Sequence, residues 1–128
     1  MIACSLPKAA WTHEAHLSTC LWLLMERPDV DLDRELGDLI RRYNLSVGGV
    51  NDSQSGYHET ITHAFLMGAR RFLRRSAGQD LLAAVNGLLA SPEGKRDWPL
   101  RFYSRERLFT PEARLGFVAP DLMAFDEA

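Results

Sequence analysis

Apolar side chains recur along most of the chain at the spacing of one α-helical face. The first such stretch begins at Thr12, whose hydroxyl can cap a helix, and ends before Pro28. Its apolar stripe consists of Leu17, Cys20, Leu21 and Leu24. Other apolar residues lie off that stripe, so we expect this helix to be apolar on almost every side and to form the centre of the fold.

Three further helices are predicted downstream. The second begins at Asp31 or Asp33 and ends before the Gly48–Gly49 pair, which permits a left-handed turn. The third covers about 57–75 and the fourth about 80–90. The side chains expected to face the core are Leu36, Leu39, Ile40 and Tyr43 in the second helix, Ile61, Phe65, Ala69 and Phe72 in the third, and Leu81, Val85 and Leu88 in the fourth.

The segment after Glu93 changes to short, punctuated pieces. Ser104 can cap one turn, and Thr110-Pro111-Glu112 has the cap, first-turn proline and acidic residue of a helix start. Its aromatic content is too high for a disordered extension. Because no stretch alternates long enough to predict a strand, we expect one all-α domain over 1–128. It should be a bundle of four or more helices with an irregular, packed C-terminal segment.

The composition indicates the class of protein and its cellular compartment. The 128 residues are 46% hydrophobic and 25% charged, which is typical of a globular domain with one core. A formal net charge of -2 argues against binding to nucleic acid or to an anionic membrane. The longest apolar run, Leu21–Met25, is too short to span a bilayer, and the first residues lack a secretory pattern, so we expect a cytoplasmic protein. Cys4 and Cys20 lack metal-type spacing, and we expect no disulfide between them.

Three of the four histidines stand at predicted helix starts. His13 and His16 open the first helix in line with its apolar stripe, and His58 opens the third. His63 falls about 140° from His58 around the helix and should face solvent. In an up-down-up-down bundle the first and third helices are parallel, so we expect His13, His16 and His58 at one end of the core.

This histidine cluster fits three interpretations. Neutral imidazoles can hold a divalent metal such as zinc, with Glu14 or Glu59 as a further ligand or as the partner of one. The same helix starts also suit a carboxylate or phosphate, with an arginine of the tail such as Arg105 closing the site. Alternatively the rings are structural and hydrogen-bond to carbonyls, threonines or carboxylates. The H-x2-H spacing matches no established metal motif.

A basic turn near the end of the third helix has a simpler interpretation. We expect these four arginines to form its solvent face, where the helix dipole favours cations: Arg70, Arg71, Arg74 and Arg75.

Three segments carry a resemblance to a known family. They are WTHEAHL at 11–17, GYHETIT at 56–62, and YSRERL at 103–108 with PEAR and PDL after it. Over most of the chain they resemble a family of small, uncharacterised bacterial helical proteins. The resemblance implies one compact unit and no particular activity or cofactor. A looser likeness is to the DinB-like helical bundles, which hold a metal through three histidines but use an H-x3-H pair.

We therefore expect a small-ligand or metal-binding helical protein with a pocket lined by His13, His16 and His58, and we leave open whether it is an enzyme. The alternative is a non-catalytic interaction protein or a homo-oligomer, in which the histidines are structural and an exposed apolar face meets a partner. A pocket with convergent polar groups would favour the first function, and a closed core with a large apolar surface patch would favour the second.

Overall fold

The computed structural model describes residues 13–46, 48, 50–52, 57–76 and 78–125. This part of the chain contains eight helical segments. In chain order they are α2 (His13–Glu26), α3 (Leu32–Ser46), α4 (Glu59–Arg75), α5 (Leu81–Ala90), the 3₁₀ turns η2 (Pro92–Gly94) and η3 (Trp98–Arg101), α6 (Arg105–Leu108) and α7 (Pro111–Leu115). These residues contain no strand, and the predicted all-α class is confirmed. No described helix has the length and hydropathy needed to cross a membrane.

The helix boundaries follow the predicted caps. Asp80, Ser104 and Thr110 each accept a hydrogen bond from a backbone N–H in the first turn of the helix that follows them. Gly78 follows the end of α4 with a φ of 89°, a left-handed conformation that suits glycine. The predicted cap of the first helix, Thr12, lies outside the described residues.

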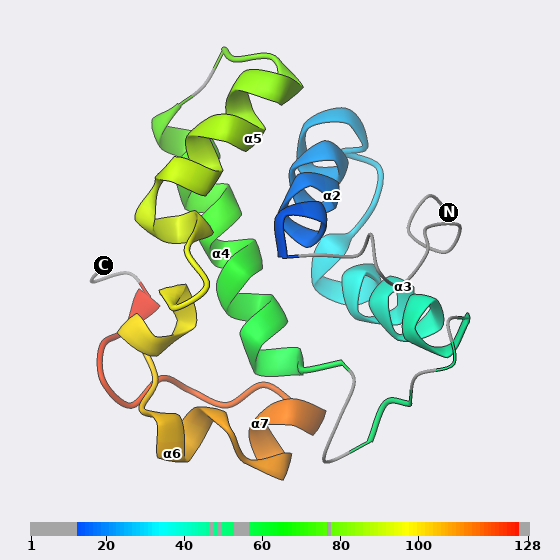
Figure 1. The fold of residues 1–128 in the computed structure, drawn as a ribbon, viewed down its shortest axis with the longest axis vertical. Helices are drawn as coiled ribbons and strands as arrows, with labels where there is room; N and C mark the ends of the chain where they lie inside the picture. Colours follow the sequence, from blue (N-terminus) through cyan, green and yellow to red (C-terminus); the bar gives the residue numbers. More distant parts are fainter. Residues whose placement is uncertain (1–12, 47, 49, 53–56, 77, 126–128) are drawn as a thin grey trace.

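Helix α4 lies in the middle of the fold (Figure 1). On one side it packs with α2, α3 and α5 around a core that includes Leu21 and Phe72. On another side it packs against the C-terminal segment, around Trp98 and Phe102. The central helix is therefore α4, and the expectation that the first helix would occupy the centre is wrong. Helix α2 is apolar on several sides because one of its faces packs on α4 and α5 while another lines a cavity.

The C-terminal segment is held to α4 by the indole of Trp98. Its Nε1 donates a hydrogen bond of 2.9 Å to the carbonyl oxygen of Ala64, and the side chain is buried. A β-carbon at Gly68 would lie 2.7 Å from that nitrogen, so the contact requires glycine at this position. The ring of Phe102 packs edge-on against Trp98, with centroids 4.8 Å apart. The tail is thus folded onto the bundle, as expected.

A buried carboxylate ties η2 to the end of α4. Glu93, with a side chain only 3% exposed, accepts hydrogen bonds of 2.5 and 2.9 Å from Arg75 and lies 3.4 Å from Arg71. The Arg75 hydrogen bonds hold the pKa of Glu93 below its usual value. On the opposite side, Arg70 pairs with Asp33 of α3 at 2.9 Å. Arg74 and Arg75 are exposed, as expected of a solvent face, whereas Arg70 and Arg71 are half-buried. Arg70, Arg71 and Arg75 also connect α4 to its neighbours.

The Trp98 contact leads to a stability prediction for Gly68→Ala. An alanine in an ordinary helix interior stabilises by about 1 kcal/mol relative to glycine. Here the added methyl group would displace the indole and its hydrogen bond, so we expect a loss of about 1–3 kcal/mol, measured by urea denaturation.

The control is the same change in a Trp98→Leu background. With the indole absent, Gly68→Ala should cost nothing or stabilise the protein. If Gly68→Ala leaves the free energy of unfolding unchanged both in the wild-type protein and in the Trp98→Leu variant, the packing of the indole does not depend on the glycine.

Candidate functional site

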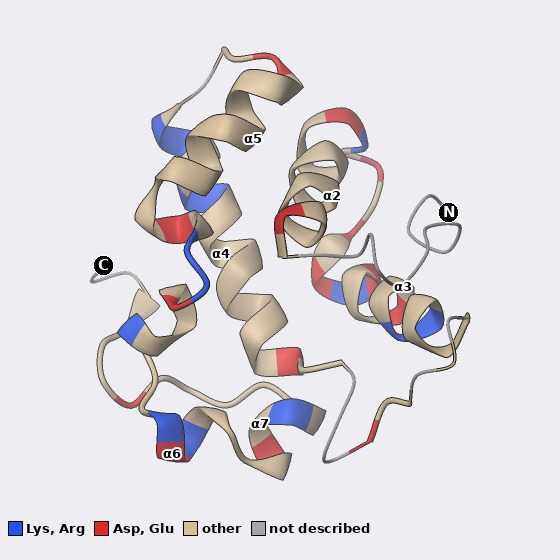
Figure 2. Cartoon of the chain, viewed as in Figure 1, with Lys and Arg blue, Asp and Glu red and all other residues tan. Residues whose placement is uncertain are grey.

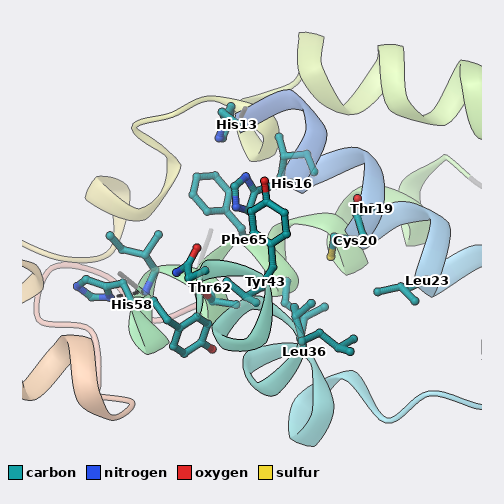
Figure 3. Close-up of a pocket in the computed structure, with 17 residues that line it drawn as sticks. His13, His16, Thr19, Cys20, Leu23, Leu36, Tyr43, His58, Thr62 and Phe65 are labelled. Carbon is teal, nitrogen blue, oxygen red and sulfur yellow. Dashed lines mark hydrogen bonds between the residues drawn. The ribbon is translucent and has the colours of Figure 1, made fainter. Parts of the chain in front are cut away.

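A cavity of about 480 Å³ lies between α2, α3 and α4 (Figure 3). Its volume is within the range typical of small-molecule sites. Most of its walls are apolar. The described residues that line it are His13, His16, Leu17, Thr19, Cys20 and Leu23 of α2, Leu36, Leu39, Ile40, Tyr43 and Asn44 of α3, and Tyr57, His58, Ile61, Thr62, Phe65 and Leu66 at the start of α4.

The direction of the helices gives this cavity a polar end and an apolar end. Helix α3 runs opposite to α4: Asp33 at its start pairs with Arg70 of α4, whereas Arg41 near its end lies 4.4 Å over the ring of Tyr57. Helix α2 runs the same way as α4 (Figure 1). The starts of α2 and α4 and the end of α3 therefore supply most of the polar lining residues, and leucines such as Leu23 and Leu36 line the opposite part (Figure 3).

His58 is the N-cap of α4 and uses both ring nitrogens within the protein. Its Nδ1 accepts from the backbone N–H of Ile61 at 3.1 Å, so its Nε2 carries the proton and donates to the carbonyl oxygen of Leu108 at 2.9 Å. Burial of the ring lowers the pKa of His58. Neither nitrogen is available to a metal, and this geometry matches the structural interpretation of the ring.

His13 and His16 line the same cavity from α2. The Nε2 of His13 lies 2.8 Å from the carbonyl oxygen of Gly94, and its ring packs edge-on against Phe65 with centroids 5.2 Å apart. The three predicted histidines thus share one cavity, as expected. However, Phe65 lies about two helical turns beyond His58, so the rings are spread along the wall. In the described part of the chain, no group of three histidine, cysteine or acidic side chains is placed to hold a metal.

The predicted partners of the histidines lie outside the cavity lining. Glu14 is 4.0 Å from Arg96 in a surface ion pair. Glu59 accepts a hydrogen bond of 2.6 Å from the hydroxyl of Tyr57. Arg105 lies over the ring of Phe109, with its guanidinium carbon 6.0 Å from the centroid. None of these charged groups is among the described residues that line this cavity.

A polar connection at the polar end was not predicted from the sequence. Asn51 accepts hydrogen bonds from the Asn44 side chain at 2.9 Å and from the Tyr57 backbone at 3.0 Å, and it donates to the Arg41 carbonyl oxygen at 3.0 Å. It therefore joins the end of α3 to the start of α4. The sequence carries no signal for this role, because two of the three partners of Asn51 are backbone atoms.

His63 does not face solvent as expected. Its ring lies 4.5 Å from that of Phe117 and 5.7 Å from that of Phe125, measured between centroids. Burial lowers the pKa of His63 as well. The helical wheel placed this side chain away from the main core, and the C-terminal segment covers that face of α4 (Figure 1).

Cys20 is a buried free thiol on the cavity wall (Figure 3). Burial raises its pKa to about 12, so the sulfur stays protonated and is a poor nucleophile at neutral pH. The other cysteine, Cys4, lies outside the described residues.

Comparison of the chain with protein-family models, with curated proteins and with solved structures gave no match.

The buried ring of His58, whose pKa is lowered by burial, predicts that acid weakens the fold. The unfolded chain protonates this ring near its ordinary pKa of about 6.5, whereas the folded protein keeps it neutral to lower pH. The unfolded state then binds more protons, so the free energy of unfolding should fall as the pH drops below about 6.5 and down to the folded pKa. His63 contributes in the same direction, and the carboxylates titrate at lower pH.

The test is His58→Asn, which can still cap α4 but does not titrate. We expect this variant to be less stable at neutral pH by about 1–3 kcal/mol, because the Leu108 carbonyl loses its donor. Urea denaturation between about pH 7 and pH 5 should show a shallower pH dependence than wild type. An identical pH dependence in the two proteins would contradict the assigned protonation of His58.

Proposed function

We propose that the protein binds a small, mainly apolar organic molecule in the cavity between α2, α3 and α4. The observation that carries this proposal is a space of about 480 Å³ whose walls are mostly apolar and whose polar lining residues come mainly from the starts of α2 and α4 and the end of α3. That combination is the usual form of a small-molecule site.

The size of the cavity is itself an argument for an occupant. Water filling the space is in contact with mostly apolar walls, which costs about 25 cal/mol per Å² of apolar surface. A ligand with an apolar body removes this cost.

Two features favour binding over chemistry at this site. The Cys20 thiol is held in its protonated form, and both nitrogens of His58 are used in hydrogen bonds to the backbone. A metal-dependent function has less support, because His58 would have to break one of these bonds to become a ligand.

Binding is testable with N-phenyl-1-naphthylamine, an uncharged probe that fluoresces in apolar surroundings. We expect saturable binding to the wild-type protein. The variant Ile40→Trp fills the cavity from α3 and should weaken binding at least about tenfold, which corresponds to 1.4 kcal/mol. Leu39→Phe is a second, milder substitution from the same wall.

The matched control is Leu45→Trp, at an exposed position of the same helix that does not line the cavity. It should bind the probe as wild type does. Probe binding that is absent in wild type, or that survives in both cavity variants while circular dichroism shows them folded, would refute the proposed function.

A second candidate function is association with another copy of the chain. Four large apolar side chains within 109–122 are each more than half exposed: Phe109, Leu115, Phe117 and Leu122. Such side chains favour an interaction surface when they form one patch. On this hypothesis, sedimentation should show a dimer that Leu115→Lys converts to monomer, whereas Leu82→Lys on α5 should leave it intact. A wild-type monomer at high concentration would exclude self-association.

A further inference from the structure

The first clue to the ligand class is the charge of the cavity wall. No aspartate, glutamate, lysine or arginine is among the described residues that line it. Along α2 the charged positions Glu14 and Glu26 are close to the two ends of the helix, and the lining stretch between them carries no formal charge (Figure 2). An ion placed against such a wall would lose its water without gaining a counter-charge. The wall therefore favours an uncharged ligand.

The second clue is that four groups at the polar end already donate to protein acceptors. His58 donates its Nε2 proton to a backbone carbonyl, and the hydroxyl of Tyr57 donates to Glu59. The Nε2 of His13 also faces a backbone carbonyl, which makes this nitrogen the donor and leaves Nδ1 as an acceptor. Asn44 donates through its amide nitrogen to Asn51 and keeps its carbonyl oxygen as an acceptor.

These bonds occupy one donor each of His58, Tyr57, His13 and Asn44. Among these four groups the lone pairs that remain are those of the His13 Nδ1 and the Asn44 amide oxygen, because the Tyr57 oxygen also accepts a hydrogen bond from Thr62. A carboxylate head group offers only acceptors and a negative charge, so it would meet lone pairs. An alcohol or a primary amide offers a donor and no charge.

The third clue is the arrangement of the two ends. Leu23 of α2 and Leu36 of α3 lie away from the polar end in Figure 3, where the histidines and Thr62 gather. A ligand with a polar head and a hydrocarbon body can satisfy both ends in only one orientation. Its head then lies near Tyr57 and His58.

We propose that this cavity binds an uncharged amphiphile, such as a medium-chain alcohol or primary amide, whose head group donates a hydrogen bond at the polar end while its hydrocarbon lies between Leu23 and Leu36. The inference rests on the proposed ligand-binding function, and it adds the chemical class of the ligand and its orientation.

The experiment displaces bound N-phenyl-1-naphthylamine with three compounds at about pH 8, where histidine is neutral. They are 1-octanol, its isomer 1-methoxyheptane, which accepts but cannot donate, and octanoate. We expect 1-octanol to compete about three- to tenfold more tightly than the ether, as one hydrogen bond requires, and more than tenfold more tightly than octanoate. Equal competition by the two isomers, or tighter competition by octanoate, would overturn the proposed class.

The orientation of bound 1-octanol is determined in a separate experiment, by nuclear Overhauser contacts in its complex with the protein. The terminal methyl group should contact the methyl groups of Leu23 and Leu36, and the carbon that bears the hydroxyl should contact the rings of Tyr57 and His58. The reverse pattern would overturn the proposed orientation. The outcomes separate the two proposals: a probe that never binds refutes ligand binding itself, whereas a probe displaced best by octanoate keeps the site and refutes only the ligand class.

Discussion

The packing of Trp98 against Gly68 fixes the C-terminal half of the molecule. Glycine lets the indole reach the backbone of α4, where Nε1 donates to the Ala64 carbonyl oxygen. Once η3 is held there, the chain that follows is close enough for Leu108 to offer its carbonyl oxygen to His58. The start of α4 is therefore organised by a segment fifty residues further along the chain. That segment is held in place because the Trp98 indole packs where Gly68 has no side chain.

Because the C-terminal segment occupies one side of α4, the cavity lies on another. Helix α3 forms its outer wall and is tied to α4 by polar contacts near both ends, the Arg70 ion pair with Asp33 at its start and the Asn51 connection at its end. The ion pair is partly exposed, and such pairs contribute about 0–1 kcal/mol. Between these two ties the apolar side chains of α3 line the cavity, and this spacing leaves room for a ligand.

The sequence predicted the helices well because their signals are local. Caps such as Ser104 and Thr110 and stripes such as that of Phe72 act within a few turns of chain. Which helix is central depends on packing between distant segments, and for that reason the apolar pattern of α2 was misleading. His63 and Arg70 were assigned to solvent for the same reason, since periodicity shows which side chains share a face but not which segment covers it.

The histidine site was predicted in part, and the limit has a physical origin. The parallel course of α2 and α4 follows from alternating topology, so the sequence could bring His13, His16 and His58 to one cavity. It could not show that His13 and His58 bond to the carbonyl oxygens of Gly94 and Leu108, because a backbone acceptor has no signature in its side chain. These bonds also reconcile the structural and the ligand-binding interpretations. If the cavity binds a ligand as proposed, the bond from His13 to the Gly94 carbonyl also leaves the His13 Nδ1 as an acceptor, so a ring that stabilises the protein contributes to the polarity of the site.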